Sequence, residues 1–380
     1  MLPFALAVLF AVLAVYSYLL YPVLLLLLVP RRSGADTPRS TPDELPRVTL
    51  IVTVHNERAR IEEKLANCAQ TDYPRDRLEV VVASDGSTDG TDDFVRSFEA
   101  LPVRLVRCEE RLGKENAQWA AIREASGEIL VFSDAGTNIP HDALHKLVRN
   151  FTDPSVGAVS SEDRFLSADG KLVGEGAYVR YEMWLRRLES RRGGLVGLSG
   201  SFFAARRELC LKDWDIHSPS DFNTALNCAS AGFVSVSDPE VIGIYKDVAD
   251  PAAEYRRKVR TVLRGMTALK RHPGALHPRL GAFAFQLWSH KIARWAVPWA
   301  LLGFLVTSLL LARHPLFAVL FALQVVGYGL VALAHYAPGL RAVAPLRIAY
   351  FFVQVNLAIA DASLRLLQGQ QMTTWTPSQR

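Results

Sequence analysis

The chain has 380 residues, of which 50% are hydrophobic, and a formal net charge of +5. This length is enough for one ordinary domain with further elements attached. The modest positive charge is compatible with a place near anionic lipid headgroups and gives no support for a nucleic-acid partner. The four cysteines have no paired spacing, so we expect buried thiols in a reducing compartment, with no disulfide framework and no zinc site.

The amino-terminal segment is apolar. Residues 2–29 carry no charge and are long enough to cross a bilayer core of about 30 Å. A cleaved signal peptide is the alternative, but no basic residue precedes the run, the run is too long, and no small-residue cleavage site follows. We therefore predict a retained membrane helix over residues 1–30. Arg31 and Arg32 come next, which places the following segment in the cytoplasm by the positive-inside rule.

The next part of the chain alternates short apolar runs with helical patterns. Residues 31–46 are rich in Pro, Ser and Thr and indicate a linker. Strands separated by helices of this length predict a doubly wound, mostly parallel α/β sheet. The predicted strands are 48–54, 80–83, 103–106 and 128–132, with later strands at 156–165 and 233–236. Glu162 and Asp163 fall in the fifth of these, and we expect them to be solvated turn acids without a role.

The carboxy-terminal third becomes apolar again after an amphipathic helix over residues 251–270. Residues 295–312 and 316–336 are each about long enough to span a membrane. A third stretch, 348–367, is interrupted by polar side chains and could span, re-enter or lie in the interface. The predicted organisation is a membrane helix (1–30), a linker (31–46), an α/β domain (47–270), interfacial and membrane helices (271–367) and a tail (368–380).

Two carboxylates follow two of the predicted strands. Asp85 ends an apolar run and begins the turn Asp85-Gly86-Ser87-Thr88-Asp89, and Asp134 follows the strand over 128–132. The carboxyl ends of parallel strands meet at one edge, where open α/β sheets bind ligands. A nucleotide diphosphate and a divalent cation suit such an edge, since Mg²⁺ prefers oxygen ligands. Lys114 adds a cation at a helix start, where backbone N–H groups already favour anions. A surface turn with a helix cap is the alternative interpretation of the first motif.

The order of these motifs resembles the family 2 glycosyltransferases of the GT-A fold. The resemblance covers roughly residues 47–270, and the flanking apolar segments resemble the membrane-bound polysaccharide-synthase branch. The fold class it implies is a Rossmann-like, mostly parallel α/β domain in the cytosol, flanked by transmembrane helices. The motifs that carry it are His55-Asn56-Glu57, Asp85-Gly86-Ser87-Thr88-Asp89, Gly113-Lys114, Ser133-Asp134-Ala135-Gly136, Gly200-Ser201-Phe202-Phe203, Ser220-Asp221-Phe222 and Arg257-Lys258-Val259-Arg260.

The resemblance implies a role for each matching residue. Asp221 matches the general base, and Asp134 matches the ligand of a metal, Mg²⁺ or Mn²⁺, that bridges the donor diphosphate. Asp85 would bind a uracil-type base. The remaining substrate-binding positions are Val54, His55 and Glu57 at the base and ribose, Lys114 near the nucleotide, Gly200 and Ser201 in the motif before Asp221, and Arg257 and Arg260 near the leaving diphosphate and acceptor.

Three motifs depart from the family pattern. Gly136 stands where the second acid of the D-x-D motif is usual, so metal binding would depend on Asp134, water and phosphate. Ser220 replaces the glutamate that processive synthases have before the general base. Thr261 replaces the tryptophan of Q-x-x-R-W, and Arg257 replaces its glutamine. These changes weaken the expectation of processive synthesis and leave nucleotide-sugar binding intact.

The resemblance implies an inverting glycosyltransferase in the plasma membrane. The donor would be a nucleotide sugar, with UDP the expected nucleotide, and the acceptor a glycan or a lipid-linked molecule in polysaccharide synthesis. Membrane lipids are the other expected partners, and the sequence leaves the oligomeric state open. Two alternatives remain: transfer of a single sugar to a lipid phosphate carrier, and a catalytically silent membrane scaffold that binds a nucleotide.

Overall fold

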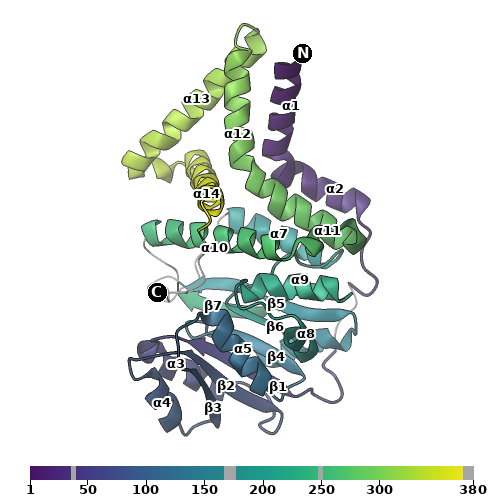
Figure 1. Ribbon diagram of the computed structural model, residues 1–380, viewed down its shortest axis with the longest axis vertical. Helices are drawn as coiled ribbons and strands as arrows, with labels where there is room; N and C mark the ends of the chain where they lie inside the picture. Colours follow the sequence, from purple (N-terminus) through teal and green to yellow (C-terminus); the bar gives the residue numbers. More distant parts are fainter. Residues whose placement is uncertain (36–39, 167–176, 247–250, 371–380) are drawn as a thin grey trace. The chain divides into compact units, whose positions relative to one another are not determined.

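The computed structural model describes residues 1–35, 40–166, 177–246 and 251–370 (Figure 1). Part of the predicted linker, 36–39, and most of the predicted tail, 371–380, lie outside the described residues. The chain divides into two compact units. The first combines residues 1–28, 250–266 and 285–371, and the second combines 29–249, 267–284 and 372–380. Each unit is described in turn.

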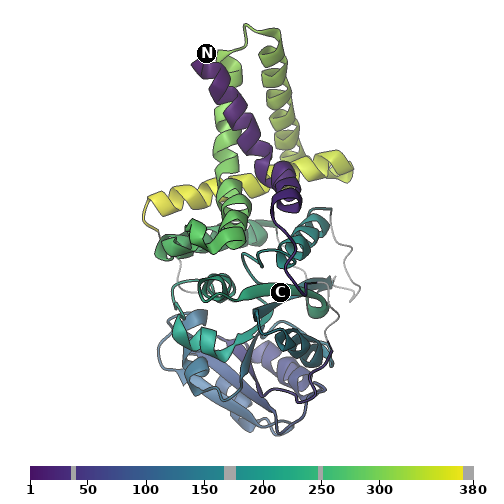
Figure 2. The same cartoon turned by 90° about the vertical axis from the view of Figure 1, so that its right-hand side faces the viewer.

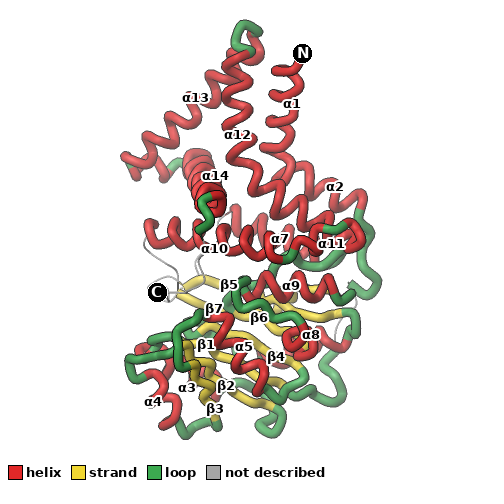
Figure 3. Tube along the Cα trace, in the orientation of Figure 1, coloured by secondary structure: helices red, strands yellow, loops and turns green. Residues whose placement is uncertain are grey.

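The second unit is built on one seven-stranded sheet with the order β3-β2-β1-β4-β6-β5-β7 (Figure 3). β6 runs antiparallel to both of its neighbours, and the other pairs are parallel, so the predicted mostly parallel sheet is confirmed. The strands are β1 (Val48–Val54), β2 (Leu78–Asp85), β3 (Val103–Cys108), β4 (Ile129–Asp134), β5 (Val156–Leu166), β6 (Phe202–Arg206) and β7 (Val234–Lys246).

Helices cover both faces of this sheet. One apolar layer packs α3, α4 and α6 against the sheet, and the other packs α5, α8 and α9 against the opposite face. The central strands are buried on both sides because their runs of Val, Ile and Leu have no polar alternation. The helices of this unit are α3 (Arg58–Ala69), α4 (Thr91–Ser97), α5 (Lys114–Glu124), α6 (Ala143–Val148), η2 (Arg149–Thr152), α7 (Ala177–Ser190), α8 (Arg207–Lys212), α9 (Ser220–Ser230), η3 (Pro273–Leu276) and η4 (Pro278–Leu280).

The expectation for Glu162 and Asp163 is wrong. Both residues lie within β5, and the side chain of Glu162 is only 2% exposed. Arg187 on α7 donates two hydrogen bonds of 2.7 Å to the Glu162 carboxylate. A buried carboxylate needs such a partner, since an unpaired charge in the interior is costly. The partner is 25 residues away in the chain, which explains why the local pattern did not indicate burial.

The first unit contains the apolar helices. Figure 2 shows the helices over residues 2–15, 293–310 and 315–336 standing upright. Four helices in the described residues are long and apolar enough to cross a membrane: Leu2–Leu28, Pro278–Leu310, Pro315–Tyr336 and Ala344–Leu367. The last of these includes the ambiguous stretch 348–367. The elements of this unit are α1 (Leu2–Val15), η1 (Tyr16–Leu20), α2 (Tyr21–Leu28), η5 (Trp288–Ile292), α12 (Ala293–Leu310), α13 (Pro315–Tyr336), η6 (Pro338–Ala342) and α14 (Ala344–Leu367), and α11 (Gly281–Leu287) belongs partly to each unit.

Helix α10 (Pro251–Arg271) belongs partly to each unit. Its residues up to 266 group with the apolar helices, and this part includes both arginines of the Q-x-x-R-W-like motif. Arg257 donates two hydrogen bonds to Glu254 one turn earlier, at 2.7 and 2.9 Å. The roles of Arg257 and Arg260 toward a donor diphosphate stay predictions.

Candidate active site

Three neighbouring strands end at the same edge of the sheet. In the parallel register Val54 lies opposite Ser84 of β2, and Thr53 lies opposite Asp134 of β4. Asp85 is therefore level with His55, one residue beyond Val54. The register brings the ends of β1, β2 and β4 together, as expected for parallel strands whose ligands bind beyond their carboxyl ends.

Asp134 joins three separate segments at this edge. Its Oδ1 accepts a hydrogen bond of 2.5 Å from Lys114 Nζ at the start of α5. The same ammonium donates to the carbonyl oxygen of Gly200, at 2.9 Å. The backbone N–H of Asp134 donates to the carbonyl oxygen of Ser201, at 3.0 Å. The Asp134 side chain is 32% exposed, so it remains accessible to a ligand.

The environment of Lys114 keeps this side chain charged. Burial alone would lower the pKa of Lys114, but the adjacent Asp134 carboxylate outweighs it, with smaller contributions from Glu115 and Asp221, so the pKa is raised. Lys114 is thus a fixed cation at the edge of the sheet, and its predicted approach to a nucleotide stays a prediction.

Asp221 reaches the same edge from the first turn of α9. The residue before this helix is Pro219, so Asp221 is not the helix cap. A Cβ built on Gly200 would lie 3.6 Å from Asp221 Oδ2, which means that the glycine backbone faces the carboxylate directly. Asp221 also contributes to the raised pKa of Lys114. The structure therefore brings Asp134, Lys114, Gly200 and Asp221 together from four distant parts of the chain.

Asp85 is fully buried and holds the turn that precedes α5. Its carboxylate accepts hydrogen bonds from the backbone N–H groups of Leu112, at 3.0 Å, and Gly113, at 3.0 and 3.1 Å. Gly113 has φ +110, which favours glycine at this position. Asp85 thereby anchors the residue next to Lys114. Its predicted contact with a nucleotide base stays a prediction.

His55 and Glu57 flank the turn between β1 and α3. His55 Nδ1 lies 2.7 Å from the backbone oxygen of Asp85, and the backbone N–H of Glu57 donates to Thr91 Oγ1 at 3.0 Å. Glu57 Oε2 accepts a hydrogen bond from Arg60, at 3.0 Å. Burial raises the pKa of Glu57 more than Arg60 lowers it. Val54 ends β1 and is buried. The contacts of these three residues with a nucleotide stay predictions.

Two polar residues at this edge, Lys64 and Asp163, were given no role in the sequence analysis. Lys64 of α3 is 2% exposed and donates to Ser133 Oγ, at 2.7 Å, and to the Thr137 carbonyl oxygen, at 2.6 Å. Asp163 accepts hydrogen bonds from Ser201 Oγ, at 2.9 Å, and Ser199 Oγ, at 2.7 Å, on either side of Gly200. The only indication in the sequence that Lys64 is buried was its position on the inner face of the helix, between Ile61 and Leu65.

The role of Asp134 as the protein ligand of a divalent cation stays a prediction, and the residues around it are compatible with that role. In the described residues, no group of three His, Cys, Asp or Glu side chains is arranged to hold a metal. Mg²⁺ is commonly bound through one or two carboxylates, with waters and substrate phosphates completing its shell. A Cβ added at Gly136 would meet no atom within 4 Å, so open space adjoins the Asp134 turn. This donor set suits a cation that arrives with phosphate.

Residues 49–213, which include every residue of this site except Asp221, match the model of glycosyl transferase family 2. The domain that holds this site has the GT-A fold. Across 98% of this chain and 100% of the other, the structure is similar to the mannosyltransferase PcManGT from Pyrobaculum calidifontis in complex with GDP-Man and Mn²⁺. The two chains are 28% identical, with a TM-score of 0.70.

Curated relatives match over the same part of the chain. Poly-beta-1,6-N-acetyl-D-glucosamine synthase of Staphylococcus aureus (strain COL) is 28% identical over 177 residues, 45% of this chain and 42% of the relative. Beta-monoglucosyldiacylglycerol synthase of Synechocystis sp. is 29% identical over 171 residues, 43% of this chain and 36% of the relative. The chain thus spans less than half the length of the curated relatives it matches.

Proposed function

We propose that this protein is a membrane-bound inverting hexosyltransferase. It moves a sugar from a nucleotide diphosphate donor to a glycan or lipid-linked acceptor in cell-surface or extracellular polysaccharide synthesis. The observation that carries the proposal is the meeting of Asp134, Lys114, Gly200 and Asp221 at one sheet edge. This arrangement sets a general-base candidate beside a cation and a metal-ligand candidate.

The reaction is a single displacement at the anomeric carbon. Asp221 accepts the proton of the acceptor hydroxyl as the oxygen attacks, and the nucleotide diphosphate leaves from the opposite face. At the anomeric carbon, the bond to the acceptor oxygen forms on the face opposite the breaking bond to the diphosphate, so the configuration inverts. A general base of this kind contributes about 10²- to 10⁴-fold in rate.

The leaving group carries the charge that the site must stabilise. Lys114 is a preorganised cation, and such groups stabilise charge that develops in a transition state. Asp134 would hold Mg²⁺ or Mn²⁺, which when bound supplies Lewis-acid stabilisation to the diphosphate. The complex of the similar mannosyltransferase with GDP-Man and Mn²⁺ supports this assignment.

The donor nucleotide is the finer part of the proposal. The motif at Asp85 favours UDP, and the relative of known structure was solved with GDP-Man. The described residues include four helices that are long and apolar enough to span a membrane, and these support a multi-pass protein of the plasma membrane. Arg31 and Arg32 after the first of them support a cytoplasmic catalytic domain.

The first test measures nucleotide release from UDP- and GDP-sugars by the purified full-length protein, with Mn²⁺ or Mg²⁺. We expect wild type to turn over at least one donor and Asp221→Asn to be slower by about 10²- to 10⁴-fold. Glu124→Gln, an exposed carboxylate at the end of α5, serves as the matched control and should equal wild type. Equal turnover by wild type and Asp221→Asn would remove Asp221 from the mechanism.

The acceptor class follows from where the transferred sugar appears. With a radiolabelled donor, label in polymer or oligosaccharide supports a glycan acceptor. Label in organic-soluble lipid supports the lipid-linked acceptor. A protein that binds a nucleotide sugar and releases no nucleotide with any donor and metal would be the silent scaffold.

A further inference from the structure

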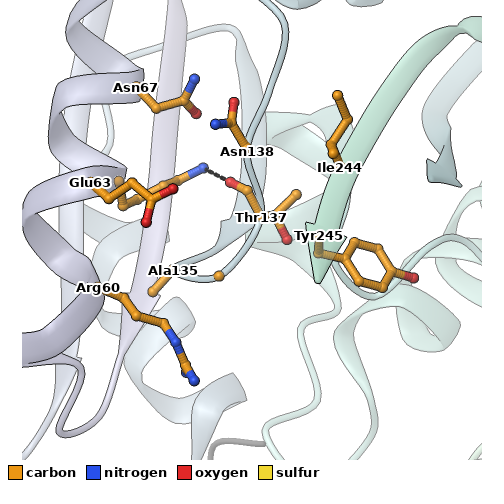
Figure 4. Close-up of a pocket in the computed structure, with 10 residues that line it drawn as sticks. Arg60, Glu63, Asn67, Ala135, Thr137, Asn138, Ile244 and Tyr245 are labelled. Carbon is orange, nitrogen blue, oxygen red and sulfur yellow. Dashed lines mark hydrogen bonds between the residues drawn. The ribbon is translucent and has the colours of Figure 1, made fainter. Parts of the chain in front are cut away.

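A cavity of about 240 Å³ lies beside the loop that follows β4 (Figure 4). It is bounded by α3, by the loop that follows β4, and by the end of β7. Every lining residue belongs to the second unit. Water occupies about 30 Å³ in the liquid, so the cavity has room for about eight waters. This size matches a single pyranose ring and is smaller than most pockets for drug-sized ligands.

The lining combines polar groups with an apolar wall. Glu63 and Asn67 face the cavity from successive turns of α3, and Asn138 lies across from them (Figure 4). Ile244 and Tyr245 of β7, with Ala135, supply apolar surface on the other side. A few placed polar groups within an apolar lining are typical of a small-ligand site.

The uncommitted groups favour a neutral, hydroxyl-bearing ligand. Glu63 and Asn138 are exposed at the mouth of the cavity, and their side chains make no hydrogen bond with another described residue, whereas Asn67 is bonded to the backbone of Ile139. An amide both donates and accepts, and a carboxylate accepts, which matches pairs of sugar hydroxyls. The apolar wall can pack on the C–H face of a sugar ring.

The cationic residues of the cavity are already engaged. Lys64 Nζ donates to Ser133 Oγ and to the Thr137 carbonyl oxygen. Arg60 is bonded to Glu57, at 3.0 Å. A phosphate would have to displace these bonds and would approach the carboxylate of Glu63, so an anionic ligand is disfavoured.

From this lining we infer that the cavity is a subsite for one sugar unit of a glycan acceptor. The cavity shares the segment Ala135–Thr137 with the turn that carries Asp134. A sugar bound there therefore contacts the loop beside the proposed donor site. The unit in the subsite is distinct from the acceptor sugar whose hydroxyl reacts at Asp221, because Asp221 belongs to the helix layer on the opposite face of the sheet. The subsite therefore holds a further unit of a longer acceptor glycan. This inference rests on the proposed transferase function.

The test measures saccharide binding directly, without turnover. Cellobiose, chitobiose, mannobiose and their tetrasaccharides are added to the full-length protein in detergent, and binding is followed by saturation-transfer difference NMR. We expect at least one of them to bind wild type in the millimolar range. Glu63→Gln combined with Asn138→Ala should weaken that binding by about tenfold or more, since these side chains supply the free hydrogen-bonding groups.

Two controls separate this inference from the proposed function. Glu124→Gln, exposed and outside the cavity, should bind the saccharide as wild type does. Nucleotide release without acceptor is measured in parallel on wild type and on Glu124→Gln, which should be equal. Absence of saccharide binding by wild type, or equal binding by the double variant, overturns the subsite. Absence of nucleotide release by wild type with saccharide binding intact overturns the transferase proposal and leaves a sugar-binding cavity.

Discussion

The two sides of the Asp134 turn each present a buried lysine, and the two lysines behave in opposite ways. On the α5 side, Lys114 is bonded to the Asp134 carboxylate, and its pKa is raised. On the α3 side, Lys64 is bonded to a hydroxyl and a carbonyl oxygen. Burial lowers the pKa of Lys64, and the nearby Cys68 and Asp134 offset this only in part.

The contrast indicates that the bonding partner, and not burial alone, determines the direction in which the pKa of a lysine shifts. A full negative charge repays the cost of desolvation at Lys114, whereas neutral oxygens do not repay it at Lys64. We therefore propose that Lys114 acts on the bound nucleotide and that Lys64 has a structural role, since it ties α3 to the turn between Ser133 and Thr137.

The largest expected effect tests this division of roles. Lys114→Met should lower the rate of nucleotide release by about 10²- to 10³-fold, as expected when one preorganised group at a developing charge is removed. Lys64→Met should retain release within about tenfold of wild type, because its contacts support the turn from the other face. Steady-state nucleotide release at saturating donor measures both.

Thermal unfolding of each variant controls for loss of the fold. Lys64→Met leaves two oxygens without their donor, and we expect it to lose about 2 kcal/mol of stability. A larger rate loss in folded Lys64→Met than in folded Lys114→Met would reverse the assignment.

The next effect is a difference in pH dependence. Lys114 has a raised pKa in the folded state, so its stabilisation is present below the unfolded value near 10.5 and is lost as the pH rises through the folded pKa. Lys64 has a lowered pKa, so its cost as a cation disappears as the pH rises from the folded pKa toward 10.5. The stability advantage of wild type over Lys114→Met should therefore shrink at alkaline pH, and that over Lys64→Met should grow. Unfolding of the three proteins between pH 7 and 11 measures both slopes, and slopes of the same sign contradict the comparison.

The smallest effect concerns one partner of Lys64. Ser133→Ala removes one of the two oxygens that accept a hydrogen bond from Lys64. We expect the free energy of unfolding to fall by about 1 kcal/mol, because the Thr137 carbonyl oxygen still accepts. Ser97→Ala, an exposed serine on α4, should change stability by less than about 0.5 kcal/mol. Denaturant unfolding of both variants measures the difference, and equal stabilities would show that the Ser133 contact contributes nothing.

Much of the site was predictable from local sequence. The apolar runs before Asp85 and Asp134 predicted two buried strands, and parallel strands place their ends at one edge. The start of α5 at Lys114 was also predicted. The sequence did not indicate the burial of Glu162, because its partner Arg187 comes from a helix that packs on β5 only in the folded chain. The cavity beside Asp134 could not be predicted from the sequence for the same reason, since α3, the loop after β4 and the end of β7 meet only in the folded chain.

The sequence by itself determined the alternation of strands and helices, the apolar spans and the family that the domain resembles, because these depend on the periodicity and order of nearby residues. Only the tertiary structure decided which lysine faces a carboxylate and which faces neutral oxygens. Lys114 and Gly200 are 86 residues apart, and Lys64 and Thr137 are 73 apart. Contacts over such separations are set by how the layers pack on the sheet, and the charge of a buried group follows from those contacts.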